Sequence, residues 1–395
     1  MRILTLNFYK GVYNITTREL VRIIRNKDLF MICFLAPLVY GILLPYVYVN
    51  KQVDNVSMGV VDEDKSELSS MMVRYLDATE ELNVTSQYPN NALGLYGIKH
   101  DNTKALLYIP KNFSSSLKKG NQSNLFIVVN SSNFLVANPI LQTSTALALG
   151  VSAKVFAKKA MGFGVNSKKV ETLMNPIMLE TRPITNTSLY YSNFMIPALF
   201  LIIIQQLILV GVGYSIAEEK ENRREREVLD LAKGSRLAIV IGKTLPYVIL
   251  DFFIGMLFAT VFARIFEVGI YTLTFSKIVV LLLFVSAVSS FGVFISSLFK
   301  TPLMAMIILM FYSMPAFLVS GYAWPKMSLP FDIKVAGYLF PSTYLMSDFR
   351  TLMLSDFPIS TYFPTILSLT LFTLISWCLG YIGVRFIFTP KSNRE

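Results

Sequence analysis

The sequence contains few of the residues on which metal and catalytic sites depend. Its single histidine, His100, has no Cys or His partner for zinc, so we expect a solvated residue rather than a ligand. Both cysteines, Cys33 and Cys378, lie in apolar runs, which leaves none for a disulfide in the polar part of the chain. No pairing of a nucleophile with a base is legible. We therefore expect a chain that is not an enzyme and that holds no metal or cofactor.

Charged residues are also scarce. Only 15% of the 395 residues are charged and 53% are hydrophobic, with a mean hydropathy of +0.52. This composition is too apolar for an ordinary soluble protein of this size and indicates a membrane protein. The net charge of +11 could indicate nucleic acid, but the bases gather at the ends of apolar runs, as they do beside membrane spans. The expected partner is therefore the lipid bilayer and not nucleic acid.

A complete phosphate-binding loop is missing as well. Gly242-Lys243-Thr244 matches the end of the pattern G-x-x-x-x-G-K-[ST], but the first glycine would fall at Leu237. The sequence after Thr244 enters an apolar run instead of opening a soluble helix. We therefore expect this chain to bind no ATP.

Six apolar runs are long enough to cross a hydrocarbon core, which takes about 20 residues. They cover residues 29–49, 194–217, 245–263, 278–299, 302–324 and 362–384. Lys300, both basic termini and the charged segment, residues 217–243, all fall on one side of these runs, which the positive-inside rule makes the cytoplasm. We expect an α-helical polytopic membrane protein with six transmembrane helices and both termini in the cytoplasm.

Residues 1–28 carry bases with apolar residues between them, close to the spacing of one helical face. The bases are Arg2, Lys10, Arg18, Arg22, Arg25 and Lys27. This pattern predicts an interfacial helix on the cytoplasmic surface, followed by the first transmembrane helix at residues 29–49.

Residues 50–190, between the first and second spans, are polar, and their short apolar runs alternate with helical patterns. Strands are predicted at Met58–Val61, Ala105–Ile109 and Leu125–Val129, and helices at Ser66–Leu76 and Leu135–Met161. Strands that alternate with helices indicate an inserted α/β domain. Because the short basic segments lie on the other side, we expect this domain to be extracytoplasmic, with its last helices as a stalk or lid over the sheet.

The charged segment mixes acids and bases. The acids are Glu218, Glu219, Glu221, Glu225, Glu227 and Asp230, and the bases are Lys220, Arg223, Arg224, Arg226, Lys233, Arg236 and Lys243. We expect a solvated surface that is broken at Gly234-Ser235 and continues into the next span. It is either a polar loop between two spans or a contact surface for a soluble partner.

Asp251 is the one acid well inside an apolar run. An intramembrane carboxylate is a functional candidate because it is costly to keep there, and it could bind a proton or a cation. The alternative is that it only forms a hydrogen bond with a neighbouring helix or faces a wet cavity.

A semi-apolar stretch follows the fifth span and is interrupted by Pro330, Gly337, Pro341 and Pro358. It is too broken to cross the membrane, and such backbone is tolerated at membrane depth only where protein or a water-filled cavity satisfies its polar groups. We predict a re-entrant helical hairpin in the outer leaflet at residues 325–354. A plain extracytoplasmic loop is the alternative.

Particular motifs resemble those of the ABC-2 type permeases of ATP-driven exporters, in the subfamily with a large extracytoplasmic domain. MGVVDEDKSELSSMMVRYLDAT and ALLYIPKNFSSSLKKGNQSNLFIVVNSSN look like segments of that domain. SGYAWPKMSLP and FPSTY are similar to the motif between the last two spans and contain Ser320, Gly321, Trp324, Pro325 and Pro341. EKEN at Glu219 to Asn222 and GKTLPY at Gly242 to Tyr247 resemble the cytoplasmic signature beside the ATPase contact. Many members carry Gly-Thr where Arg223-Arg224 stand.

The resemblance implies a permease subunit in a bacterial inner membrane, paired with a second copy or a homologous permease. It implies export of a hydrophobic or amphipathic substrate, a drug-like molecule or a lipid, driven by a separate ABC ATPase that holds the ATP and Mg²⁺. Such systems often work with a periplasmic adaptor protein. The ATPase would dock on the charged segment and the N-terminal helix, with coupling residues Glu218, Glu219, Glu221, Arg223, Arg224 and Glu225. Reversing Glu219 and Glu221 to Lys is expected to weaken docking and to leave folding intact.

Two other functions remain as alternatives. An ion-coupled secondary transporter using Asp251 predicts internal repeats among the spans, and none is seen. A membrane-anchored extracytoplasmic receptor or scaffold would use the spans only as an anchor, and the dense charged segment counts against it.

Overall fold

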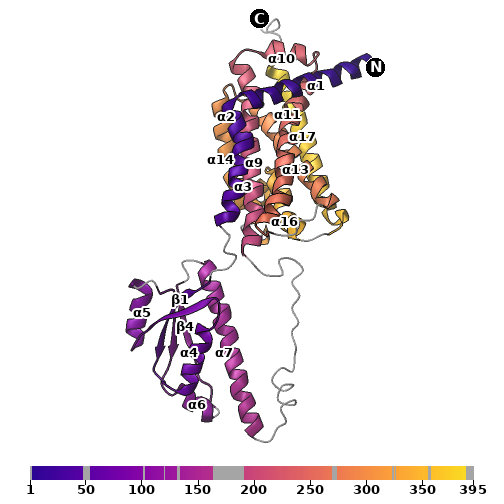
Figure 1. The fold of residues 1–395 in the computed structure, drawn as a ribbon. Helices are drawn as coiled ribbons and strands as arrows, with labels where there is room; N and C mark the ends of the chain where they lie inside the picture. Colours follow the sequence, from indigo (N-terminus) through magenta and orange to yellow (C-terminus); the bar gives the residue numbers. More distant parts are fainter. Residues whose placement is uncertain are drawn as a thin grey trace. The chain divides into compact units, whose positions relative to one another are not determined.

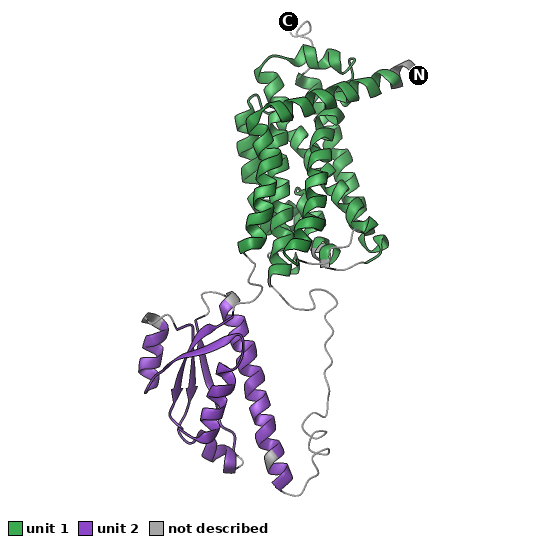
Figure 2. Ribbon diagram, viewed as in Figure 1, with its two compact units in different colours: residues 1–49, 183–395 green, residues 50–182 purple. Residues whose placement is uncertain are grey.

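The computed structural model of the protein describes most of the chain in two compact units (Figure 2). The described residues are 2–47, 54–100, 103–119, 121–130, 134–162, 191–268, 274–322, 324, 326–354 and 357–387. Unit 1 comprises residues 1–49 and 183–395, and unit 2 comprises residues 50–182. Unit 2 therefore begins where the predicted inserted domain begins and ends a little before it.

Unit 2 is built on a four-stranded sheet with the order β2-β1-β3-β4. The strands are β1 (Val56–Asp62), β2 (Leu82–Gln87), β3 (Ala105–Ile109) and β4 (Phe126–Val129). β1 pairs in parallel with β2 and β3, and β4 is antiparallel to β3. β1, β3 and β4 coincide with predicted strands. β2 was not predicted, because most of its residues are polar and only Leu82 is fully buried.

Four helices accompany the sheet in the described part of unit 2. They are α4 (Glu67–Asp77), α5 (Asn91–His100), α6 (Phe113–Lys119) and α7 (Phe134–Gly162). α4 begins at a reciprocal cap, in which Ser66 Oγ accepts a bond from Ser69 N at 3.1 Å and Ser69 Oγ accepts one from Ser66 N at 2.9 Å. α7 packs on α4 and β4, and its Ile140 is completely buried in the core of the sheet. The predicted helix at Leu135–Met161 is thus present and lies against the sheet.

Seven helices in the described part of the chain are long and apolar enough to cross a membrane. Six are in unit 1 and match the six predicted runs: Lys27–Val47, Ser192–Glu221, Arg236–Ile265, Phe275–Leu298, Pro302–Val319 and Ile359–Ile387. The seventh, Val136–Gly162, is part of α7 in unit 2. It exceeds the predicted number, and it packs on α4 and β4 within unit 2.

Unit 1 is entirely helical in its described part. In chain order its elements are α1 (Arg2–Arg25), α2 (Lys27–Phe30), the π-helical turn η1 (Met31–Leu35), α3 (Ala36–Val47), α9 (Tyr191–Glu221), α10 (Glu225–Leu231), α11 (Arg236–Leu257), the π-helical turn η2 (Phe258–Phe262), α12 (Ala263–Ile265), α13 (Phe275–Leu298), α14 (Pro302–Val319), the 3-10 turn η3 (Lys326–Ser328), α15 (Phe331–Gly337), α16 (Pro341–Leu354), the 3-10 turn η4 (Ile359–Tyr362) and α17 (Phe363–Ile387).

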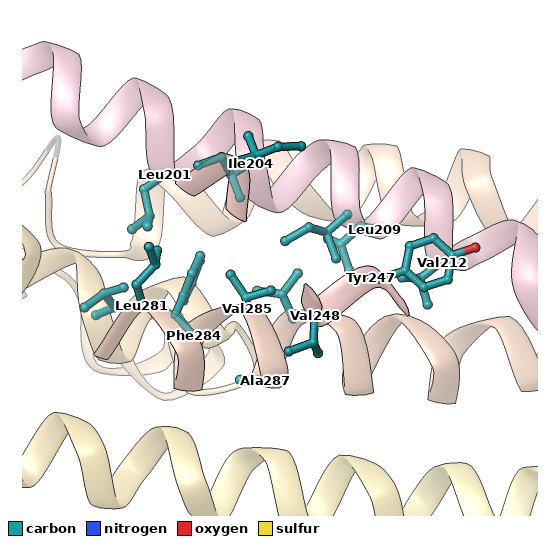
Figure 3. Packing of buried hydrophobic residues seen from close by; sticks show 14 of the residues in the cluster. Leu201, Ile204, Leu209, Val212, Tyr247, Val248, Leu281, Phe284, Val285 and Ala287 are labelled. Carbon is teal, nitrogen blue, oxygen red and sulfur yellow. The ribbon is translucent and has the colours of Figure 1, made fainter. Parts of the chain in front are cut away.

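The helix α9 is the centre of unit 1 and contacts α3, α11, α13, α14 and α16. Figure 3 shows its inward-facing side chains packed with those of α11 and α13. The labelled residues are Leu201, Ile204, Leu209, Val212, Tyr247, Val248, Leu281, Phe284, Val285 and Ala287. The helix α9 can approach η1 closely because Gly211 of α9 has no side chain. A Cβ at this position would lie 2.6 Å from Sγ of Cys33 in η1.

The helix α1 runs across one end of the bundle, where α10 also lies (Figure 1). It packs along α11, with buried Ile15 and Ile23 facing inward and Tyr9 and Ile24 exposed. It ends at Arg25, and the side chain of the next residue, Asn26, caps α2 by accepting bonds from the backbone N of Asp28 and Leu29. A helix therefore occupies the segment for which the sequence predicts an interfacial helix.

Candidate functional site

The charged segment folds into the end of α9, the short helix α10 and the start of α11. Two turns separate these helices, and both contain left-handed backbone: φ is 54° at Arg223, 54° at Lys233 and +79° at Gly234. Ser235 then caps α11 by accepting a bond from Ala238 N at 3.3 Å. The predicted break at Gly234-Ser235 is confirmed, and the charges are distributed over three helices that face different surroundings.

The centre of the site is a lysine buried between two carboxylates. Lys243 Nζ lies 2.7 Å from Oε2 of Glu19 and 2.7 Å from Oε1 of Glu219. It also donates to the carbonyl oxygen of Ser215 at 3.1 Å. The exposed fractions of Glu19, Glu219 and Lys243 are only 1%, 2% and 1%. Because the three residues come from α1, α9 and α11, this one ammonium group joins three helices.

Two arginines of α1 complete the arrangement. Arg18 forms a two-pronged pair with Glu219, with both distances at 3.1 Å. Arg22 donates to Glu218 at 2.5 Å, to Ser215 O at 3.3 Å and to Glu19. We call these six charged residues, Arg18, Glu19, Arg22, Glu218, Glu219 and Lys243, the ion-pair cluster. Its three carboxylates and three cations balance, which is the condition under which buried charges are tolerated.

Glu19 is held in its charged form by its neighbours. Burial opposes ionisation, but the charges of Arg22 and Lys243, together with bonds from Lys243 and Ser215, outweigh it and hold the pKa of Glu19 below its ordinary value. Tyr247 adds a hydroxyl that donates to Glu19 Oε1 at 3.1 Å. Burial likewise acts to lower the pKa of Arg22, and the charge of Glu19 more than compensates, so that this pKa is raised.

One prediction about the charged segment is wrong. The sequence pattern placed Glu219 and Lys243 on a solvated surface, whereas both are buried. The reason is that α1, more than 200 residues away in sequence from both, covers them and supplies their partners. It follows that reversing Glu219 to Lys cannot leave folding intact, because the new ammonium group would face Lys243 and Arg18.

The other predicted coupling residues remain near the surface. Glu221, Arg223 and Arg224 are exposed, and Glu218 and Glu225 are half-buried. Sequence analysis named the coupling residues Glu218, Glu219, Glu221, Arg223, Arg224 and Glu225. It did not single out Glu19, which pairs with Arg22 and Lys243. A usable signal was present, since Glu19 is the only acid in the basic stretch before Asp28.

Asp251 lies about two turns farther along α11 than Lys243. Its side chain is buried, and Oδ2 has no hydrogen-bond partner among the residues that the structure describes. On the neighbouring helix α9, Gln205 is completely buried, and both atoms of its amide lack partners in the same described part of the chain. The described residues contain no group of three or more His, Cys, Asp or Glu that could hold a metal ion.

Comparison with known proteins decides the family. The family model described as "ABC-2 family transporter protein" matches residues 27–382. The chain belongs to the ABC-2 family of transporter proteins. The resemblance inferred from the motifs is thereby confirmed. With its apolar helices, this ABC-2 protein is a multi-pass membrane protein.

Two curated relatives match this ABC-2 protein along almost their whole length. "Probable multidrug ABC transporter permease YbhR" of Escherichia coli (strain K12) is 24% identical over 391 residues, which cover 95% of this chain and 99% of the relative. "Probable multidrug ABC transporter permease YbhS" of the same organism is 20% identical over 390 residues, covering 97% of each. Both relatives are named as permeases, which are transporter subunits and not enzymes.

The outer motif of this ABC-2 protein forms the turn after α14 and the start of α16. Gly321 has a φ of +87°, and a Cβ there would meet the side chain of Lys326, so the turn requires glycine. Ser320 is buried, Trp324 is 59% exposed, and Pro341 begins α16. Pro325 lies outside the described residues. α15 and α16 form two successive short helices at the predicted hairpin, and α16 packs into the bundle against α9, α13 and α17.

Proposed function

We propose that this ABC-2 protein is the membrane-spanning permease subunit of an ATP-binding-cassette exporter. It moves a hydrophobic or amphipathic substrate, a drug-like molecule or a lipid, out of the cytoplasm or the inner leaflet. The energy comes from a separate ATPase subunit, which holds the ATP and Mg²⁺. Both relatives are named as probable multidrug ABC transporter permeases, which supports this proposal.

The observation that carries the proposal is the ion-pair cluster. It fastens α1 to α9 and α11 at the end of the bundle where α10 presents exposed charges. A partner that moves α1 therefore moves the inner ends of α9 and α11 with it, because separating buried, hydrogen-bonded ion pairs is costly. This is the mechanical connection that an exporter needs between a soluble motor and its spans.

The proposed topology places this end in the cytoplasm and unit 2 outside. Six helices of unit 1 cross a bacterial inner membrane, with both termini inside, and α15 with α16 forms the re-entrant hairpin in the outer leaflet. The support is the positive-inside pattern, since the charged segment and Lys300 gather at one end of the runs.

The proposed assembly is a dimer of two permeases, identical or homologous, each docked on one ATPase. A periplasmic adaptor protein is a further proposed partner, contacting the extracytoplasmic domain. The docking surface consists of the exposed charges of the charged segment, represented by Glu221, Arg223 and Arg224, together with the exposed face of α1.

The decisive experiment is purification of the tagged chain followed by identification and reconstitution of what accompanies it. We expect an ATPase with a complete phosphate-binding loop to copurify, and we expect export from vesicles to require ATP. The ion-coupled alternative, which rests on buried Asp251, predicts instead that export stops when ion gradients are dissipated and continues without ATP. That result, or export by the chain without any ATPase, would overturn the proposal.

A further inference from the structure

The interface between α9 and α11 contains polar groups that the ion-pair cluster does not use. Gln205 and Asp251 both lie in the middle of apolar helices and are 0% and 2% exposed. Three of their side-chain polar atoms, Oε1 and Nε2 of Gln205 and Oδ2 of Asp251, have no partner among the described residues. Unpaired polar groups inside a membrane protein are energetically costly. Their presence therefore indicates a function, such as binding a ligand, forming an ion pathway or making a packing contact.

The two residues lie at the same level of the bundle. The rings of Phe200 and Phe258 are 4.3 Å apart on one side of them, and Tyr247 lies against Gly211 on the other side. Gln205 is between Phe200 and Gly211 on α9, and Asp251 is between Tyr247 and Phe258 on α11. These two contacts therefore bracket both polar residues within one short stretch of the helix pair.

An apolar cavity adjoins this level of the bundle. It has a volume of about 30 Å³ and is lined by Leu201, Phe200, Phe258, Gly255 and Leu281 among others. Gln205 is one turn from Leu201 on α9, and Asp251 is one turn from Gly255 on α11, so both polar residues are on the helix faces that line the cavity. The cavity thus has aromatic and aliphatic walls and a carboxylate and an amide beside one end.

The charge at the other end of the cavity has the opposite sign. Lys277, in the first turn of α13, also lines it and is 3% exposed. A cationic group is favoured near the carboxylate of Asp251, and Phe200 and Phe258 line the same cavity. Aromatic faces attract cations as well as apolar groups.

We propose that Asp251 and Gln205 form the polar part of a binding site for an amphipathic cation, whose apolar groups occupy the adjoining cavity. This proposal rests on the proposed function and names the substrate class of the exporter. The carboxylate supplies the counter-charge, and Gln205 Oε1 accepts a hydrogen bond where the cation carries a donor. At about 30 Å³ the cavity holds about one water molecule, so the site is closed in this conformation. The ligand selects a second conformation, in which Phe200 and Phe258 separate.

The helix α11 has a local device for that separation. Its π-helical turn η2 begins at Phe258, directly beyond the cavity-lining residues Gly255 and Met256. A π-helical turn lacks the regular hydrogen-bond ladder of an α-helix and frequently occurs at functional sites. A shift of Phe258 can therefore be absorbed within η2 while the inner half of α11 remains held by Lys243 in the ion-pair cluster.

The test uses two probes of equal size and opposite charge, the tetraphenylphosphonium cation and the tetraphenylborate anion, with the purified full-length chain. Equilibrium dialysis should show that Asp251→Asn weakens binding of the cation by about tenfold or more, because a buried cation loses its counter-charge. Binding of the anion should not weaken. Asp251→Glu should recover part of the cation affinity, and Glu80→Gln, which removes an exposed acid of unit 2, should change neither.

A second variant keeps the proposal testable if Asp251→Asn does not fold. Gly255→Ala adds a Cβ 2.9 Å from Cδ2 of Leu281, at the flexible end of that side chain, and so narrows the cavity without removing charge. It should weaken both probes. Equal cation affinity in the wild type and Asp251→Asn, or no cation binding by the wild type, would overturn the proposed site.

The experiment separates this site from the proposed function because the binding measurement needs no ATPase. Loss of cation binding in Asp251→Asn together with ATP-independent transport would support the site and refute the exporter. ATP-driven export of neutral or anionic compounds, with no Asp251-dependent binding of the cation, would leave the exporter standing and refute the site.

Discussion

Lys243 Nζ lies 2.7 Å from Oε1 of Glu219, and the two side chains are only 1% and 3% exposed. The lysine is on α11 and the glutamate near the end of α9, and Glu19 of α1 contacts the same ammonium group. A buried pair of this kind adds little stability compared with apolar residues of equal volume. Removing one member is a different matter, because the remaining charges stay buried without compensation.

Replacing Lys243 with Met should therefore destabilise the protein strongly. It leaves Glu19 and Glu219 facing each other, and the expected loss is about 3–5 kcal/mol in the free energy of unfolding. Lys233→Met is the matched control, because Lys233 is exposed and a surface change of this kind stays within about 0.5 kcal/mol. Denaturant titration of the detergent-solubilised chain measures both. Equal stability of the two variants would contradict the central role of Lys243.

Much of the fold can be predicted from this sequence because its strongest signals are local. The six apolar runs, the strands β1, β3 and β4 and the break at Gly234-Ser235 all follow from hydrophobic pattern and turn residues within a few positions. β2 is missed for the same reason, since its pattern is mostly polar and only its pairing with β1 makes it a strand.

The ion-pair cluster could be predicted only in part. The charges of α9 and of the charged segment are visible in the sequence, but their burial depends on where α1 lies. Arg18 and Glu219 are separated by 201 residues, and no periodicity in either helix identifies the other as its partner. Asp251 shows the opposite case: its position in an apolar run was enough to identify it as unusual, and burial confirms that it is inside the bundle.

The ionised state of Glu19 should make stability depend on pH in the acid range. Its folded-state pKa is lowered, so its contribution is complete above the ordinary value of about 4.3 and is lost as the pH falls through the lowered pKa. The melting temperature of the wild type should therefore fall more steeply between about pH 5 and pH 3 than that of Glu19→Gln. Glu221→Gln, at an exposed position, serves as the control and should follow the wild type. Parallel curves for Glu19→Gln and the wild type would show that Glu19 is not charged in the folded protein.

Arg223 is a non-glycine residue in left-handed backbone, with a φ of 54°. Arg223→Gly removes the steric conflict of the Cβ and should stabilise the chain by about 0.5–1 kcal/mol. Arg226→Gly, three residues later within α10, should instead cost about 1 kcal/mol, because helical backbone disfavours glycine. Melting temperatures of both variants against the wild type provide the measurement. A loss of stability in Arg223→Gly would mean that the arginine side chain contributes more than its backbone strain costs.

The proposed topology can be tested by labelling with a membrane-impermeant maleimide. Because Cys378 is exposed, the test uses a Cys378→Ser background, in which the remaining Cys33 is buried. Ser116→Cys and Asn121→Cys in unit 2 should react in intact cells. Lys233→Cys, in the turn after α10, should react only after permeabilisation. The reverse pattern would place unit 2 in the cytoplasm.

The charged segment offers a test of docking that avoids its buried residues. Glu221 and Arg224 are both exposed and lie at the turn between α9 and α10, so reversing them should change stability by about 1 kcal/mol or less. If the segment docks on an ATPase, each reversal places like charges together in the interface, which can cost several kcal/mol of binding. Glu221→Lys and Arg224→Glu should each weaken association with the ATPase and reduce ATP-driven export. The double variant restores the net charge of the surface but leaves the two charges at exchanged positions. Weak binding by the double variant would show that the pairing is specific to position, whereas recovery would show that only the net charge of the surface matters.

Glu219→Lys is the contrasting variant: it should yield little folded protein, because the new cation would face Lys243 and Arg18 in the ion-pair cluster. If both single reversals insert, bind the ATPase and export normally, then these residues are not the contact, and docking must be sought on the exposed face of α1.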